Sequence, residues 1–416
     1  MPGVSGFEWS VSGTEIPKLA SQMSKIMTER IAQLRDDFQR LYGMAPSVLV
    51  KGPGRVDLMG IHTDYNDGFV LPIAVNVDVI AGGRLRNDRK VRVYSANFDK
   101  AAEFDLDNIE YDGAQKWSNY VRGVAKFIQE KGIELRGANI ALHGNVPLGS
   151  GLSSSAALEM ATGVLFQALT GFKMSGPDMA LVGQAAENKF VGVSTGIMDQ
   201  FVSRNGQKDH ALFLDCRSLA FEQLPLDTSK VKVVVCNTMK QRGLVDSEYG
   251  LRRSQCEEAV RLFQQWLPNV KALRDVTCAD LHEYGDRLPS NVYMRADHII
   301  SENERGLKCR EVLASGGLEE FGELMNASHD SARDSYEVSC PELEAMVAVT
   351  RAAPGSLCGR LAGAGFGGCT VSLVADASVP GFVETVKREY QKKTGLAPEL
   401  YVCTSEDGAR VLEDYR

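Results

Sequence analysis

The sequence predicts a mixed α/β (α+β) protein, because segments with strand character alternate with segments of helical periodicity. Branched residues alternate over 139–143, a turn rich in glycine and serine follows, and strong helix formers begin at Ala156. Residues 69–94 also alternate, and residues 87–89 fit the turn of a hairpin. Apolar residues recur at helical spacing over 19–41, which predicts an amphipathic helix.

Length and composition bound the kind of protein this can be. The chain has 416 residues, of which 44% are hydrophobic and 24% charged, so two or three domains with a large core are expected. The net charge of −8 and the scattered basic residues argue against nucleic acid or an anionic membrane as a partner. The amino end lacks a signal-peptide pattern, and the nine cysteines contain no C-x-x-C pair. We therefore expect a cytoplasmic protein without disulfides or a zinc site, and we also expect a monomer.

A polar loop follows the first predicted helix. Residues 1–18 are expected to be a loosely ordered lead-in, and a short strand begins near residue 48. The loop after it concentrates six polar side chains within thirteen residues: Arg55, Asp57, His62, Asp64, Tyr65 and Asp67. Such a density fits a site for a small polyhydroxylated ligand and, equally, a solvated surface loop.

A glycine- and serine-rich loop at residues 147–155 leads directly into the helix formers. Backbone N–H groups and the positive end of the helix dipole would face a bound anion there, and the serines add hydroxyl donors and possible metal ligands. The alternative is an ordinary loop with a serine N-cap. No Gly-Lys-Ser/Thr follows the glycines, so this is not a Walker A loop.

Two side chains in the middle of the chain could have either a structural or a functional role. Trp117 begins a predicted helix that runs to residue 131, and its ring could lie in the core or stack on a base. A helix over 177–190 precedes a turn over 192–201 that presents Asp199. A lone aspartate in a turn is usually a cap, unless Arg55 and the glycine-rich loop fold against it.

The C-terminal half contains strands, charged helices and a late glycine-rich segment. Strands are expected at 210–215 and 231–236, a polar helix at 247–256 and further helices over 281–353. Gly363, Gly365 and Gly368 formally match the dinucleotide fingerprint, but a strand-like run follows them in place of a helix. These glycines therefore predict close backbone packing or contact with a ligand, and they do not indicate a dehydrogenase.

Three long motifs connect these observations: residues 53–72 (PGRVDLMGIHTDYNDGFVLP), residues 145–159 and residues 361–370. In this order they resemble the galactokinase signature, the phosphate loop and the third glycine-rich motif of the GHMP small-molecule kinases, and within that family its galactokinase branch. The resemblance implies two α/β lobes with the active site between them. It assigns a ribosomal-protein-S5-like lobe to residues 19–215 and a ferredoxin-like lobe to residues 216–416.

The resemblance also implies a sugar 1-kinase that uses ATP and Mg²⁺. Phosphoryl transfer needs positioning, charge neutralisation and an acceptor for the hydroxyl proton. Asp199 would be the base beside Arg55, and Glu187 would hold Mg²⁺ with Ser155 or Ser154. Trp117 would lie against the adenine, and the phosphates would contact Gly149, Ser150, Gly151, Ser153, Ser154 and Ser155. The sugar hydroxyls would contact His62, Asp64, Gly196 and Tyr249.

One departure from the family pattern concerns the sugar. The galactokinase branch carries Gly-Glu-His where residues 60–62 are Gly-Ile-His, and that glutamate accepts the hydroxyl on carbon 6 of galactose. Ile61 accepts no hydrogen bond, and its bulk would fill the space near that hydroxyl, at a cost of roughly 1–3 kcal/mol. We therefore expect L-arabinose, which lacks carbon 6, to be favoured, with an ordinary galactokinase as the alternative. A sugar sensor without turnover is a third possibility, which the intact serines at 153–155 disfavour.

Overall fold

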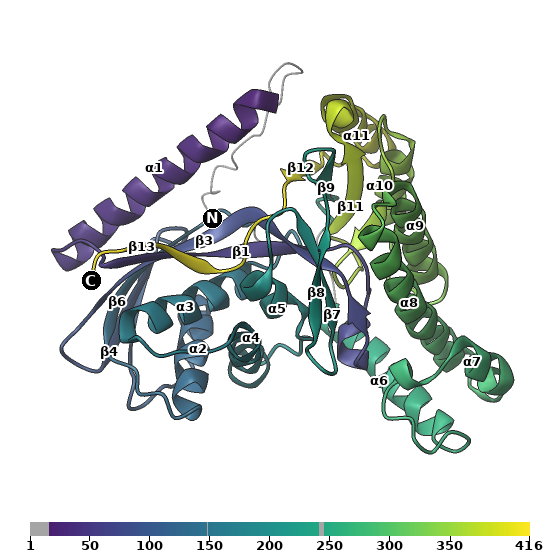
Figure 1. Cartoon of the computed structure of the whole chain (residues 1–416), viewed down its shortest axis with the longest axis horizontal. Helices are drawn as coiled ribbons and strands as arrows, with labels where there is room; N and C mark the ends of the chain where they lie inside the picture. The colour runs from purple at the N-terminus through teal and green to yellow at the C-terminus, as the bar shows by residue number, and fades with distance from the viewer. Residues whose placement is uncertain (1–15, 148, 241–244) are drawn as a thin grey trace.

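The structure, a computed structural model, describes residues 16–147, 149–240 and 245–416, so most of the predicted lead-in lies outside the described residues. Strands and helices alternate along this part of the chain, as expected of a mixed α/β protein (Figure 1). One sheet has the strand order β13-β1-β3-β6-β4-β5. Its strands are β1 (Val48–Asp57), β3 (Pro72–Leu85), β4 (Lys90–Ser95), β5 (Lys100–Asp105), β6 (Ala138–Gly144) and β13 (Arg410–Asp414).

Helices cover both faces of this sheet because side chains alternate along its strands. On one face Leu49 packs with Phe38 of α1 (Ile16–Tyr42), which confirms the predicted amphipathic helix. On the other face its neighbour Val48 joins the core beneath α3 (Ser154–Thr170). Figure 1 shows α1 and α3 on opposite sides of β1 and β3. The period of two along β1 therefore separates two apolar layers.

The prediction of a hairpin over residues 69–94 is wrong. The alternating residues do form β3 and β4, but β6 lies between them, antiparallel to β3 and parallel to β4. Ile140 of β6 is paired with Gly83 on one side and with Val93 on the other. β4 forms its antiparallel pair with β5 instead. Alternation predicts that a strand exists, whereas its neighbour is decided by a strand that comes much later in the chain.

Further helices and a small sheet continue the N-terminal part. The helices are α2 (Asn119–Glu130), α4 (Gly176–Ala185) and α5 (Met198–Asn205), and the sheet contains β2 (Phe69–Val70), β7 (His210–Asp215) and β8 (Phe221–Pro225). The helix expected over 177–190 is α-helical only to Ala185 and continues as a π-helix over Ala186–Val191. Such wide turns occur frequently at functional sites.

The C-terminal part is built on a sheet with the strand order β10-β11-β9-β12. Its strands are β9 (Val231–Asn237), β10 (Arg360–Ala362), β11 (Cys369–Ala375) and β12 (Glu399–Cys403). The helices are α6 (Val245–Phe263), α7 (Cys278–Tyr284), α8 (Ser290–Ala314), α9 (Leu318–Asp334), α10 (Pro341–Ala352) and α11 (Val379–Thr394). An apolar cluster joins α10 and α11 to the sheet, and another joins α6, α8 and α9. The glycines at 363–368 connect two antiparallel strands, and the second of them, β11, is the strand-like run that the sequence indicated.

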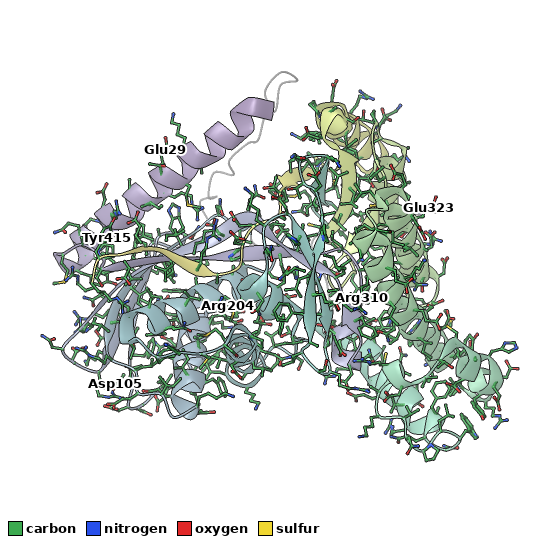
Figure 2. All side chains as sticks on the ribbon, in the orientation of Figure 1. Glu29, Asp105, Arg204, Arg310, Glu323 and Tyr415 are labelled. Atoms are coloured by element: carbon green, nitrogen blue, oxygen red, sulfur yellow. The ribbon has the colours of Figure 1, made fainter. Side chains whose placement is uncertain are left out.

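Strands and side chains cross the lobe boundary expected at residue 215. β8 pairs with β7, and β13 returns to pair with β1. Two arginines labelled in Figure 2 add contacts between distant segments. Arg204 of α5 donates to the carbonyl of Ala409 at 3.2 Å across this boundary, whereas Arg310 of α8 donates to Glu222 of β8 at 2.8 Å within the second predicted lobe. β13 comes from the end of the chain but belongs to the first sheet, so the two sheets do not separate at residue 215. The division into lobes at this residue stays a prediction.

Two further properties are the thiol state of the cysteines and the apolar character of the long helices. All nine cysteines are free thiols. Over the described ranges, no helix has both the length and the apolar character that crossing a bilayer requires.

Candidate active site

A cavity of about 340 Å³ is lined by residues from the first part of the segment 57–69, from the loop 147–155, from 193–196 and from the start of α5. Tyr249 of α6 and Ala364 after β10 also line it, so both parts of the chain contribute. The predicted site residues that the structure brings together here are Arg55, His62, Asp64, Gly149, Gly151, Ser153, Ser154, Ser155, Gly196, Asp199 and Tyr249. Residues far apart in the sequence therefore meet at one concave site.

A bidentate ion pair lies in this cavity. Arg55 donates from Nε and Nη2 to the two carboxylate oxygens of Asp199, each at 2.6 Å. Asp199 lies in the first turn of α5 and not in an open turn as expected, and its side chain keeps 20% of its surface exposed. Ser153 donates to the same carboxylate, and Arg55 also donates to the carbonyl of Gly151. One guanidinium therefore joins the carboxylate to the loop, which is the arrangement that a functional Asp199 requires.

The loop 147–155 adopts backbone conformations that glycine favours. Gly149 has φ 73° and Gly151 has φ 75°. Ser153 has φ 55°, yet its hydroxyl makes no capping bond to α3. The alternative of an ordinary serine N-cap is therefore wrong. Ser154 and Ser155 begin α3 and line the cavity, so the positive end of the helix dipole lies at the site.

Glu187 lies beside the cavity on the π-helical segment and is 5% exposed. Gln200 donates to its carboxylate at 2.6 Å and to that of Glu159 at 3.0 Å. Burial and the charge of Asp199 raise the pKa of Glu187 to about 7, while a hydrogen bond with Ser155 lowers it. A carboxylate beside a hydroxyl fits Mg²⁺, which takes few protein ligands and keeps phosphate and water oxygens. Among the described residues, no group of three His, Cys, Asp or Glu side chains could hold a metal ion.

Asp64 and Gly196 lie in close contact on another wall of the cavity. A Cβ atom at position 196 would meet Asp64 Oδ2 at 1.7 Å, so this approach requires glycine. Burial raises the pKa of Asp64 to about 7, and the neighbouring charge of Asp199 adds to this shift. Near neutral pH, Asp64 is therefore poised between its acid and carboxylate forms.

His62 is a neutral ring fixed on both of its nitrogens. Burial lowers its pKa to about 3, so the ring carries one N–H. Nε2 donates to the carbonyl of Ala364 at 3.2 Å, and Nδ1 accepts from the hydroxyl of Tyr65 at 2.8 Å. The rings of Tyr249 and Tyr336 lie 5.2 and 4.9 Å from the His62 ring, centroid to centroid. His62 is therefore rigidly oriented at the cavity.

Three family models match separate parts of the chain. The "Galactokinase galactose-binding signature" matches residues 36–85, which contain the segment 57–69. The "GHMP kinases N terminal domain" matches residues 119–207, and the "GHMP kinases C terminal" model matches residues 309–392. They follow one another in the order expected from the sequence motifs.

Whole-length relatives extend this similarity. A galactokinase of Roseiflexus sp. is 45% identical over 385 residues, which cover 92% of this chain and 98% of the relative. The chain belongs to the galactokinase family. A galactokinase of Chloroflexus aurantiacus is 46% identical over 371 residues, which cover 89% of this chain and 95% of the relative.

Solved structures agree with the galactokinase family fold. The crystal structure of Lactococcus lactis galactokinase complexed with galactose matches with a TM-score of 0.87 and 35% identity, over 91% of this chain and 99% of that chain. The Methanococcus jannaschii mevalonate kinase matches with a TM-score of 0.61 and 15% identity, over 87% of this chain and 99% of that chain, and shows the fold alone. The expected GHMP kinase fold is confirmed.

Ile61, at the departure from the galactokinase family pattern, lies outside the cavity lining. Its side chain is 1% exposed and packs in the apolar cluster that contains Ala259 of α6 and Ala296 of α8. Its two neighbours have left-handed backbones, with φ 102° at Gly60 and 62° at His62. The expectation that its bulk fills space beside a carbon-6 hydroxyl stays a prediction.

Trp117 and Ser150 also lie outside the cavity lining. Ser150 Oγ donates to a carbonyl of its own loop at 2.7 Å and so braces the loop. Trp117 is half-buried and stacks on Phe98, with ring centroids 6.1 Å apart. Phe98 is 44% exposed, and the adjacent Asn97 is hydrogen-bonded to Gly144, the last residue of β6 before the galactokinase family's phosphate-loop motif. The aromatic pair therefore lies close to that motif.

Sequence reasoning missed several residues that complete the site. Gln200 bridges two buried carboxylates, and its position directly after Asp199 was the available signal. Ala364 receives the His62 hydrogen bond, and its glycine-rich surroundings had indicated contact with a ligand. Glu302 contacts the backbone of the segment 57–69, but a carboxylate in a charged helix gave no such signal.

Proposed function

We propose that this protein transfers the γ-phosphoryl group of ATP to the anomeric C1 hydroxyl of galactose. The observation that carries the proposal is the cluster of Arg55, Asp199 and Ser153, where a carboxylate meets a loop suited to phosphates. Membership of the galactokinase family supports it, as does the likeness to a galactokinase complexed with galactose.

The residues can perform phosphoryl transfer mainly by positioning and charge neutralisation. Asp199 takes the proton of the C1 hydroxyl as its oxygen attacks the γ-phosphorus and the bond to ADP breaks. Arg55 orients that carboxylate from two donors and neutralises charge on the phosphoryl oxygens. The N-terminus of α3 and the loop before it bind the phosphates through backbone N–H groups.

The proposed cofactor site is formed by Glu187 and Ser155, whose side chains are hydrogen-bonded to each other. When bound there, Mg²⁺ neutralises phosphate charge and fixes the phosphate geometry. Gln200 donates to Glu187 and orients its carboxylate toward this position. The half-buried Trp117, with exposed Phe98 beside it, offers a stacking surface for adenine.

The choice between galactose and L-arabinose depends on Ile61. Because this side chain packs into a helical core outside the cavity lining, the structure gives no steric reason to exclude a carbon-6 hydroxyl. Galactose is therefore the main proposal, and a preference for L-arabinose is the weaker alternative that Gly-Ile-His at residues 60–62 suggested. A sugar sensor without turnover stays the least supported, since Arg55, Ser153 and Asp199 form a connected cluster.

The proposal keeps the expected cytoplasmic location and monomeric state. Nine free thiols are consistent with a reducing compartment. Light scattering of the purified protein would test the monomer, and a mass of two or more chains would contradict it.

The deciding experiment measures ADP release with Mg-ATP across galactose, L-arabinose, D-fucose, galacturonate and N-acetylgalactosamine at matched concentrations. ADP release that requires galactose, with galactose the best sugar, is the expected result. A tenfold advantage of L-arabinose over galactose would instead support the preference inferred from residue 61. Binding of sugar and ATP without any ADP release would support the sensor and contradict the kinase.

A further inference from the structure

Glu302 is a buried carboxylate of α8 that contacts the segment 57–69 from the C-terminal part of the chain. Its Oε1 accepts the backbone N–H groups of Gly60 and Ile61, both at 3.1 Å. The hydroxyl of Ser328 on α9 donates to the same oxygen at 2.6 Å. Two adjacent amides on one oxygen fix the orientation of the peptide units that precede His62.

The charge of Glu302 is retained in spite of complete burial. Burial alone would raise its pKa, but the charge of Arg305, helped by His298, lowers it to about 2. Arg305 donates from Nε to Oε2 at 2.8 Å, so the two carboxylate oxygens have different partners. Hydrogen bonds to an ionised acceptor are stronger than those between neutral groups. Glu302 therefore holds the turn with charge-assisted bonds.

A second side chain of α8 holds the same turn from its carbonyl side. His298 Nε2 donates to the carbonyl of Ile61 at 3.1 Å. The peptide plane between Ile61 and His62 is thus fixed by a donor on α8, and the preceding amides are fixed by an acceptor on α8. His62 itself has φ 62°, a conformation that a residue with a side chain adopts at a cost of roughly 1–2 kcal/mol.

The consequence is that α8 determines where the His62 ring lies. This ring lines the cavity, and its hydrogen bonds to Ala364 and Tyr65 have defined directions. A small rotation of the turn would move the ring and the neighbouring Asp64 together. Displacements of about 1 Å at a substrate-contacting group are enough to weaken binding or catalysis strongly.

We infer that Glu302 is a positioning residue that sets the affinity for the sugar by holding the turn of residues 60–62. The inference rests on the proposed function for the identity of the sugar. It concerns the sugar and not ATP, because Glu302 is hydrogen-bonded to the segment 57–69 and to no described residue of the loop 147–155. Glu302 does not touch the substrate in this role and acts through backbone hydrogen bonds.

The test compares two substitutions that remove different properties of the same side chain. Glu302→Gln keeps the length but places an amide against Arg305, and Glu302→Asp keeps the charge but is one methylene too short to reach the turn. The matched control is Glu304→Gln, at an exposed position of the same helix. We expect both Glu302 variants to raise the KM for galactose at least tenfold, with the KM for ATP within twofold of the parent protein. The control should leave both KM values within twofold.

A milder variant covers the case in which the Glu302 variants do not fold. Ser328→Ala removes only the hydroxyl donor to Oε1 and should raise the KM for galactose about threefold. Equal rises in both KM values, a loss of kcat alone, or an unchanged KM for galactose in a folded variant would overturn the inference.

Calorimetric titration of galactose separates this inference from the proposed function. If the parent protein binds galactose without turnover, the kinase proposal fails, while the inference still predicts a tenfold weaker Kd in the Glu302 variants. If the parent protein turns over galactose and the variants bind it normally, the inference alone fails.

Discussion

The segment 57–69 and the loop 147–155 line the same cavity, but the two are held in different ways. Buried charged and polar groups of the C-terminal part hold the first: Arg360 donates to Asp57 at 2.7 Å, Glu302 accepts from Gly60, and Asn303 accepts from Phe69 at 3.1 Å. The loop is joined to itself, to Arg55 and, through two serines, to Asp199 and Glu187, and Gly149 is exposed.

The difference indicates that the two substrates are received differently. A binding surface whose groups are already fixed loses less entropy when a ligand binds. The segment 57–69 therefore favours one arrangement of hydroxyl groups, which suits recognition of a particular sugar. The loop presents glycines and serines beside the active-site side chains Arg55, Asp199 and Glu187, which suits phosphates that bring their own charge and metal. Specificity is thus expected on the first side and adaptability on the second.

The largest effect is expected where both regions meet, at Asp199. Asp199→Asn should lower kcat by roughly 10²–10⁴-fold, because the variant cannot accept the hydroxyl proton. The Kd for ATP should change less than threefold, measured by calorimetry, since the loop is unaltered. Asp105→Asn on β5 is the control. Turnover close to that of the parent protein would remove Asp199 from the role of base.

The two regions can be compared directly through their glycines. Gly60 has φ 102°, and the Cβ atom that Gly60→Ala adds would lie 2.5 Å from the carbonyl oxygen of Phe69. We therefore expect this variant to raise the KM for galactose at least tenfold. Gly149 has φ 73°, and the Cβ atom that Gly149→Ala adds would meet no atom within 4 Å. The variant therefore carries only the conformational cost of a left-handed backbone, roughly 1–2 kcal/mol. It should raise the KM for ATP a few-fold and leave that for galactose unchanged.

Steady-state kinetics in both substrates would check this comparison. Gly113→Ala, at a glycine without left-handed backbone and with no atom within 4 Å of its Cβ, is the matched control. If either site glycine changed both KM values equally, the two regions would not act separately.

A smaller effect is expected from pH. The pKa values of Asp64 and Glu187 are each raised to about 7, so both lose their negative charge as the pH falls through 7. If catalysis needs the ionised forms, kcat/KM should fall on the acid side of pH 7. Stability should change in the opposite direction, since a carboxyl with a raised pKa in the folded state favours folding at low pH. That contribution is lost as the pH rises from about 4 through 7.

Urea unfolding at pH 5 and pH 7 would measure the predicted loss of stability as the pH rises. Asp64→Asn removes one of the two groups, so its urea midpoint should fall less between these pH values than that of the parent protein. Parallel changes in both proteins would show that Asp64 titrates normally.

The smallest effect is expected at Glu159, a fully buried neighbour of Glu187. Burial raises its pKa well above the usual value and so favours the neutral form, and Glu159→Gln should therefore keep kcat and both KM values within twofold. Glu187→Gln, by contrast, should raise the Mg²⁺ concentration for half-maximal rate at least tenfold. A large loss of activity in Glu159→Gln would show that this carboxyl works in its charged form.

Local patterns in the sequence predicted most elements but not their partners. The helical spacing over 19–41 and the alternation before the loop gave α1 and β6 nearly to their ends. Alternation could not show that β6 separates β3 from β4, because strand pairing is decided by contacts between distant segments.

The candidate site was predictable where a motif carries it and less so elsewhere. Arg55 and Asp199 were named together from family motifs, and the structure pairs them. Ile61 was expected beside the sugar, and its packing among residues of α6 and α8 could not be predicted, because those contacts come from distant segments. Glu302 was not found, since a carboxylate in a charged helix resembles a solvated one until its neighbours are known.

The pairing of β13 with β1 has a consequence for how the protein is made. During synthesis on the ribosome, β1 and β3 emerge early, but the strand that covers the free edge of β1 emerges almost a whole chain length later. Until then, β1 exposes a row of unpaired backbone groups, which other nascent chains can join. Completion of the N-terminal sheet therefore waits for translation to reach residues 410–414, and removing these residues would leave that edge open to aggregation.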